Sequence, residues 1–111
     1  MEYNKLVRDK IPEIIIDKHG ENSLDIKELK NKRDILVYSL NKLIEEAYEL
    51  KDAVMNDASD SLEELADVVC ALKKVQKELE YTDENVEAAC IIKTANKGGF
   101  EHNFVLKEVR T

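Results

Sequence analysis

The chain has very few of the residues that form turns or fill large cores. Its 111 residues include no tryptophan, one proline and three glycines, and aromatic residues make up 5%. So few turn-forming residues argue against an all-β fold, which needs a turn between successive strands. The core must therefore be built from Leu, Ile, Val and Ala, and the 37% of charged residues suits solvent-facing helices. We predict a single all-α domain over residues 1–111, with a core small enough to favour association of subunits.

Several motifs that define common enzyme classes are also missing. The sequence contains no P-loop, no Gly-x-Ser-x-Gly and no Cys-x-x-Cys. Its two histidines, His19 and His102, do not form the Glu-x-x-His pattern that a ferritin-like di-iron site requires. We interpret both as exposed polar residues. No cluster of histidine and cysteine is available for zinc.

The cellular compartment of the protein is predicted from the absence of long hydrophobic runs. No hydrophobic run approaches the length of a membrane-spanning helix, and the N-terminus lacks the apolar core of a signal peptide. Cys70 and Cys90 each lie in an apolar helical run, so we expect buried, reduced thiols. These features predict a cytoplasmic protein without a membrane partner.

The net charge of −7 is concentrated in one part of the chain. Residues 45–67 contain nine acidic residues and one basic residue, a local charge of −8, so the remainder sums to +1. A concentrated acidic patch favours a cation site over general solubility. It also argues against nucleic acid as a partner, because an acidic patch repels phosphate unless a metal ion intervenes.

Capping signals divide the chain into four predicted helices. A short helix is expected after Asp9, with Gly20 as its end. The others are expected at about 34–54, 61–79 and 82–96, the last capped by Thr82. Residues 21–33 are ambiguous, because Ser23-Leu24-Asp25-Ile26 alternates like a short strand while the charged residues after it suit the next helix. The apolar residues of the C-terminal tail predict a docked extended segment.

Two stretches, residues 43–50 and 62–68, share the pattern Glu-Glu-x-x-acid-aliphatic. On a helical wheel the second glutamate of each lies at the edge of an apolar stripe, and the later acid lies on the same edge at roughly 300°. The two pairs are Glu46 with Glu49, and Glu64 with Asp67. The stripes consist of Leu36, Leu40, Leu43, Ala47, Leu50 and Val54 in the first helix, and Leu65, Val68, Leu72, Val75 and Leu79 in the second.

Antiparallel packing of these two helices would bring the four carboxylates together. Such a group repels itself unless cations lie between its members, and Mg²⁺ prefers oxygen ligands. Glu45 and Glu63 lie farther from the stripes, so we interpret them as outer or solvated groups, although Glu45 could orient a water. The alternative is an ordinary solvated helix surface. Ser61-x-x-Glu64 also matches a capping box, which gives Glu64 a purely structural interpretation.

Phosphate-binding groups would have to come from two basic clusters. One is Lys5 and Arg8 near the N-terminus, and the other is Lys93, Asn96 and Lys97. The alternative for either cluster is a solvated basic face.

Three blocks, in order along nearly the whole chain, resemble motifs of the MazG-type nucleotide pyrophosphohydrolases, an all-α superfamily. The acidic block is Glu45-Glu46-x-x-Glu49 followed by Glu64-x-x-Asp67. The opening, Tyr3 to Pro12, and the segment Lys93 to Glu101 resemble the small single-domain phosphoribosyl-ATP pyrophosphohydrolase-like branch. The resemblance implies a four-helix domain whose bundle is completed by subunit association, as a homodimer or higher homo-oligomer.

The same resemblance implies Mg²⁺-dependent hydrolysis of a (d)NTP or related nucleotide to a monophosphate and pyrophosphate, with Mn²⁺ as a substitute. By motif position the metal ligands would be Glu46, Glu49, Glu64 and Asp67. Glu45 or Glu49 would orient the attacking water, and the residues near the substrate would be Lys5, Arg8, Lys93, Asn96 and Lys97. Two alternatives remain. One is a phosphoribosyl-ATP pyrophosphohydrolase of histidine biosynthesis, and the other is a non-catalytic helical module for nucleotide binding or assembly.

Overall fold

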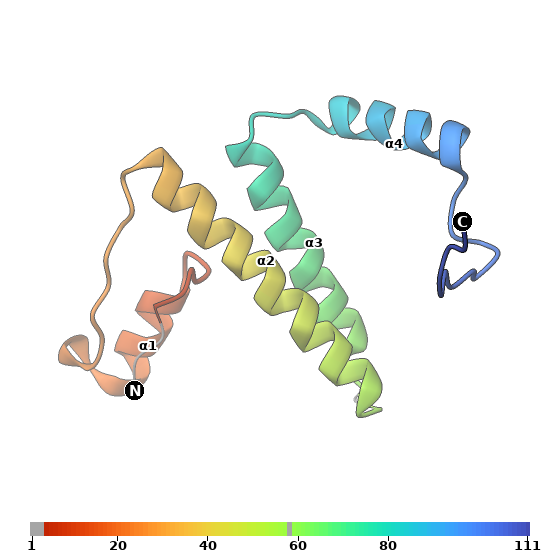
Figure 1. Cartoon of the computed structure of the whole chain (residues 1–111). Helices are drawn as coiled ribbons and strands as arrows, with labels where there is room; N and C mark the ends of the chain where they lie inside the picture. The colour runs from red at the N-terminus through yellow and green to blue at the C-terminus, as the bar shows by residue number, and fades with distance from the viewer. Residues whose placement is uncertain (1–3, 58) are drawn as a thin grey trace. The chain divides into compact units, whose positions relative to one another are not determined.

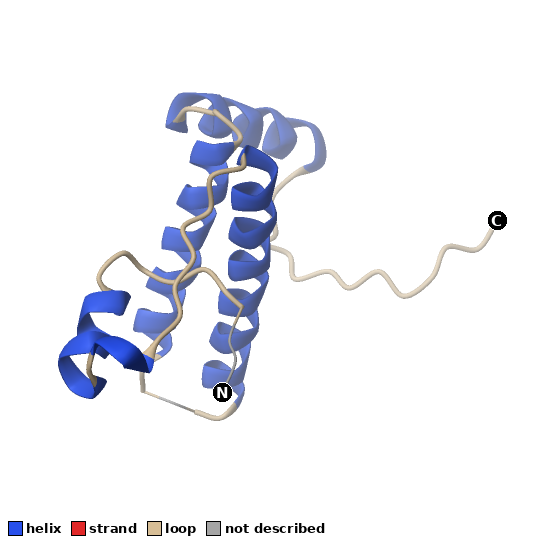
Figure 2. Cartoon of the chain, turned by 90° about the vertical axis from the view of Figure 1, so that its left-hand side faces the viewer, coloured by secondary structure: helices blue, strands red, loops and turns tan. Residues whose placement is uncertain are grey.

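The computed structural model describes residues 4–57 and 59–111, and within these ranges it contains helices and loops but no strand (Figures 1 and 2). The helices are α1 (Ile11–His19), the 3₁₀ helix η1 (Glu21–Ser23), α2 (Lys32–Met55), α3 (Ser61–Glu78) and α4 (Asp83–Lys97). The prediction of an all-α chain with four α-helices is confirmed for the described residues. They divide into two compact units, Met1–Glu80 and Tyr81–Thr111. No helix in the described ranges has the length and apolar composition needed to cross a membrane.

The start of α1 differs from its prediction, whereas its end agrees. The helix is preceded by Lys10 rather than Asp9 and has no side-chain cap, although Pro12 occupies its first turn as expected. Gly20 ends it with φ of 89°, a backbone angle that residues with a Cβ rarely adopt. The chain then continues through η1 into a loop, and the alternation at residues 23–26 produces no strand because no described strand is present to pair with it.

Local side chains determine where α2 begins, whereas α3 begins without a side-chain cap. The Asn31 side chain accepts a hydrogen bond from the Asp34 backbone N–H at 3.1 Å, so α2 begins at Lys32, two residues earlier than predicted. Asp60 precedes α3 but makes no side-chain cap, and Ser61 is already helical. The predicted capping box of Ser61 with Glu64 is therefore wrong.

α2 and α3 form an antiparallel hairpin whose contact line holds Ser, Ala and Val side chains and one buried Glu (Figures 1 and 2). Ser39, Glu46 and Ala53, spaced seven apart, are the buried residues of α2, and Ala71 and Val75 are those of α3. The Ser39 hydroxyl is fully buried and donates to the Ile35 carbonyl at 2.7 Å. Small side chains along this line allow the two helices to approach closely. We call this line of contact the seam.

The predicted apolar stripes are not the centre of the seam. If Glu46 and Glu64 are set at zero on their wheels, the buried residues lie within roughly 20° of zero on each helix. The exposed large hydrophobic residues lie at roughly 80–200° on α2 and 60–160° on α3. They are Val37, Leu40, Ile44, Tyr48, Val54 and Met55 on α2, Leu62, Leu65, Val69 and Leu72 on α3, and Leu79 directly after α3. Of the residues in the predicted stripes, Leu40, Ala47, Val54, Leu65, Leu72 and Leu79 are exposed in the single chain.

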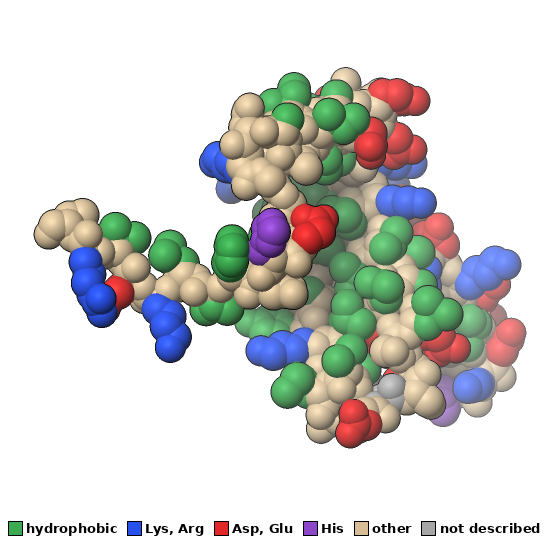
Figure 3. All heavy atoms as spheres, turned by 90° about the vertical axis from the view of Figure 1, so that its right-hand side faces the viewer, with side chains coloured by type: hydrophobic (Ala, Val, Ile, Leu, Met, Phe, Trp, Pro, Cys, Tyr) green, Lys and Arg blue, Asp and Glu red, His purple; other side chains and the backbone are tan. Residues whose placement is uncertain are grey.

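These exposed residues form one surface. Because the helices run antiparallel, a rotation in the same sense from the seam on each helix leads to the same side of the hairpin. We call this side the apolar face, and Figure 3 shows hydrophobic side chains exposed along the hairpin. The acids near 300° lie on the opposite side, so the hairpin separates a hydrophobic surface from an acidic one.

The second unit begins with the cap that the sequence predicts. The Thr82 hydroxyl accepts from the Asn85 backbone N–H at 3.1 Å, and the Asn85 side chain accepts from the Thr82 N–H at 3.0 Å. α4 ends at Gly98, which has φ of 81°. The prediction of a docked tail is not met within the second unit, where Phe104, Val105, Leu106 and Val109 are all exposed.

The prediction of buried thiols is also wrong, because Cys70 and Cys90 are both exposed. Cys70 lies near 240° on the α3 wheel, away from the seam and on the side that carries the acids. Cys90 lies on α4, which has no buried residue. Both histidines are exposed, as predicted.

Candidate functional site

Five carboxylates gather where α2 and α3 face each other. Oxygen atoms of Glu45, Glu46 and Glu49 lie within 4.8 Å of one another, and so do oxygen atoms of Glu46, Glu64 and Asp67. Glu46 belongs to both groups and joins them. We call the five residues the carboxylate cluster. The structure thus brings together the four acids predicted from helical spacing, and it adds Glu45.

Glu46 is the most constrained member of the cluster. The residue is only 6% exposed although it carries a carboxylate. Its Oε1 atom forms an ion pair with the Lys42 ammonium at 3.1 Å, whereas its buried Oε2 atom accepts no hydrogen bond. The Oε2 atom of Glu64 is likewise buried without a partner. A buried acceptor left unpaired destabilises the fold, and a group of such oxygens suits a hard cation.

The pKa values reflect this crowding. Loss of water contact raises the pKa of Glu49 above its usual range, and a hydrogen bond with Glu46 and the charges of Glu46, Glu45 and Glu64 act in the same direction. Desolvation also raises the pKa of Glu64, followed by the charges of nearby acids, of which Asp60 and Asp67 are the strongest. A bound cation would oppose both effects by stabilising the ionised carboxylates.

Three cationic side chains lie around the cluster. The Lys5 ammonium lies 3.1 Å from Glu45 Oε1, and the Lys42 ammonium lies 3.7 Å from Glu45 Oε2. The Arg8 guanidinium donates to Asp67 Oδ1 at 2.6 Å. The contacts with Lys5 and Lys42 hold Glu45 between two ammonium groups. The hydrogen bond with Glu45 is also the main cause of a raised pKa for Lys5.

Sequence reasoning missed Lys42, although a signal was present. Lys42 precedes Glu45 by three residues and Glu46 by four, and residues at these spacings lie side by side on a helix. Its side chain is only 19% exposed, which is low for a lysine.

Of the other predicted site residues, two contact the carboxylate cluster and three belong to the second unit. Lys5 and Arg8, predicted near the substrate, contact the carboxylate cluster directly. Lys93, Asn96 and Lys97 are exposed on α4 in the second unit, and their role in a site stays a prediction. Tyr3, the first residue of the N-terminal motif, lies outside the described residues.

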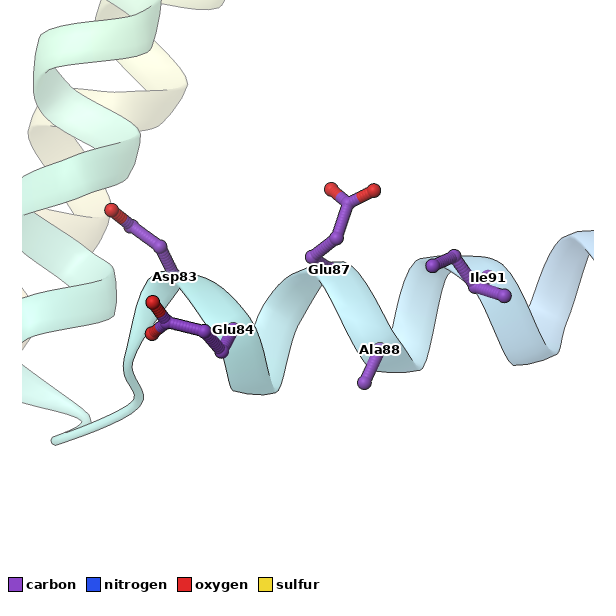
Figure 4. A pocket seen from close by; sticks show the side chains of 5 residues that line it. All are labelled: Asp83, Glu84, Glu87, Ala88 and Ile91. Atoms are coloured by element: carbon purple, nitrogen blue, oxygen red, sulfur yellow. The ribbon is translucent and has the colours of Figure 1, made fainter.

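A shallow hollow on α4 is a separate feature (Figure 4). Its lining residues are Asp83, Glu84, Glu87, Ala88 and Ile91, all from that one helix. Three of the five are acidic, so the hollow does not suit a phosphate.

Comparisons of the chain with family models, with curated proteins and with solved structures returned no match.

The raised pKa of Glu64 predicts a pH-dependent gain in stability for Glu64→Gln in the presence of EDTA. A glutamate with a raised folded-state pKa leaves the protein most stable below its ordinary pKa, and stability falls as the pH rises through the folded value. The variant has no carboxylate to ionise, so its Tm should exceed that of the wild type at pH 7. The difference should disappear near pH 3.5, about one unit below the ordinary pKa.

Thermal unfolding followed by circular dichroism checks this expectation. Glu63→Gln, at an exposed neighbour on the same helix, is the matched control and should not reproduce the gain. A Tm for Glu64→Gln below that of the wild type at pH 7 would show that this carboxylate stabilises the metal-free fold.

Proposed function

We propose that the chain is a Mg²⁺-dependent pyrophosphohydrolase that converts a nucleoside triphosphate or a related nucleotide to a monophosphate and pyrophosphate. The observation that carries the proposal is the pair of buried, unpartnered oxygens of Glu46 and Glu64 inside the carboxylate cluster. The resemblance of the three sequence blocks to MazG-type enzymes supports the same function.

The carboxylate cluster fits magnesium by its chemistry. All its donor atoms are carboxylate oxygens, which Mg²⁺ prefers, and Mn²⁺ accepts the same ligands. Glu46, Glu64 and Asp67 would hold the ion, with Glu49 beside them. When bound, Mg²⁺ supplies positive charge that polarises a phosphoryl group and makes water a stronger nucleophile.

The side chains around the ligands suit different tasks. Both Glu45 oxygens already lie near ammonium groups, whereas burial and neighbouring charges raise the pKa of Glu49. Because ammonium groups engage both Glu45 oxygens, we assign the orientation of the attacking water to Glu49 and a supporting role to Glu45. Lys5 and Arg8 lie close enough to the cluster to interact with substrate phosphates. Lys93, Asn96 and Lys97 on α4 remain substrate-binding residues that only the sequence resemblance implies.

A homodimer or a higher homo-oligomer completes the proposal. A two-helix hairpin with a seam of small residues buries little hydrophobic area, and its apolar face has no cover within the described part of the first unit. A second copy placed on that face would form a four-helix arrangement and leave the carboxylate side accessible.

Pyrophosphate release from a panel of NTPs, dNTPs and phosphoribosyl-ATP in the presence of Mg²⁺ tests the activity. We expect release from at least one nucleotide and its loss on addition of EDTA. Glu46→Gln and Asp67→Asn should each lower kcat/KM by about 100-fold or more, because each removes a charge that holds the cation.

Glu63→Gln is the matched control for these variants and should retain activity. If the wild type releases no pyrophosphate from any nucleotide while an active control enzyme does, the proposal of a catalytic function is wrong. A non-catalytic module would then be favoured.

Light scattering coupled to size-exclusion chromatography tests the subunit association. Ile44 is 55% exposed on the apolar face, so Ile44→Asp would place a charge in the proposed interface and should yield a monomer. Asn41→Asp adds the same charge at an exposed polar position of α2 and should leave the oligomer intact. A wild type that is monomeric at high micromolar concentration would contradict the association.

A further inference from the structure

Two of the three cations at the carboxylate cluster come from the segment that precedes α1, not from the helices that carry the acids. Lys5 reaches Glu45 across 40 positions of the sequence, and Arg8 reaches Asp67 across 59. These ion pairs attach the N-terminal segment to both helices of the hairpin. Lys42 differs, because it lies on α2 itself and pairs within one helical turn.

The Arg8 guanidinium lies where it would compete with a metal ion. It donates to Asp67 Oδ1 at 2.6 Å, and Asp67 shares an oxygen cluster with Glu46 and Glu64. This ion pair holds the guanidinium against α3, the helix that carries Asp67. Its side chain is 59% exposed, so it could leave Asp67 for water at small cost.

The charges of the site suit one divalent ion while these cations are in place. Five carboxylates stand against the three cations Lys5, Arg8 and Lys42, which leaves two negative charges when all are ionised. One divalent cation balances this remainder. Its approach to Asp67 brings a charge of +2 toward the guanidinium, which repels it.

We propose, on the basis of the metal site proposed above, that Arg8 occupies Asp67 in the metal-free protein and is displaced when a divalent cation binds. Metal binding and attachment of the N-terminal segment through Arg8 therefore disfavour each other. Cation binding weakens the hold of Asp67 on Arg8, and the released guanidinium becomes available to an anionic ligand at the same site. By the same coupling, the Arg8–Asp67 pair lowers the affinity for the metal.

Isothermal titration of chelator-treated protein with MgCl₂ and with MnCl₂ tests the coupling without any measurement of turnover. Arg8→Gln should bind either ion about fivefold more tightly than the wild type, because it removes one competing charge. The difference should shrink as NaCl is raised from 20 mM to about 500 mM, since salt screens it. Lys10→Gln removes an equal charge from the same segment outside the cluster and should change the affinity by less than about twofold.

The side-chain NMR signal of Arg8 provides a second measurement on the folded wild type. The arginine Nε–H resonance that is absent from the spectrum of Arg8→Gln should shift during a Mg²⁺ titration and reach its final position at one equivalent. Circular dichroism of each variant confirms that the helices are retained.

The outcomes separate this inference from the proposed function. Equal or weaker metal binding by Arg8→Gln, with clear binding by the wild type, would overturn the competition and leave the metal site intact. Binding by Arg8→Gln alone would support the competition. Absence of binding by both proteins would overturn both the competition and the metal site.

Discussion

The burial of the Glu46 carboxylate between two helices is the constraint on which the rest of the structure depends. Ser39 and Ala53, one heptad away on each side, allow α2 and α3 to approach, and Glu46 occupies the place between them where an aliphatic side chain would pack at lower cost. Lys42 pairs with one oxygen, and the other oxygen is buried without a hydrogen bond. Glu46 also shares an oxygen cluster with Glu64 and Asp67. A fold retains an acid at such a position when something else compensates for it, and we propose that a divalent cation does so.

The same seam determines which surface of the hairpin is apolar and exposed. Because its centre lies on the Glu46 and Glu64 edge, the large aliphatic residues are rotated away from it and form the apolar face on one side of the hairpin. The acids occupy the other side, where Lys5 and Arg8 reach them from the N-terminal segment. The acidic side and the apolar face are thus separated by the antiparallel geometry of two helices, and a substitution on one side need not disturb the other.

Helix positions and the acidic edge could be predicted from the sequence because they depend on local signals. The cap at Thr82 follows from its own neighbours, and a helical period is enough to distinguish Glu46 from the adjacent Glu45. The burial of each residue could not be predicted. A helical wheel gives the angle of each side chain around its own helix, but it does not say which angle faces the neighbouring helix. For this reason Leu40 and Cys70 were expected inside and are exposed. The Arg8–Asp67 pair joins residues 59 positions apart and carries no local signal.

A crystal soaked in MnCl₂ and measured at the manganese absorption edge tests the central claim most directly. The account predicts an anomalous peak within about 2.5 Å of carboxylate oxygens from both helices, with Glu46, Glu64 and Asp67 among the ligands. It also predicts that the Glu46 oxygen now without a hydrogen bond points to the peak. A well-diffracting crystal with no peak at the carboxylate cluster, or with a peak only at other surface acids, would contradict the claim that these buried carboxylates form a metal site.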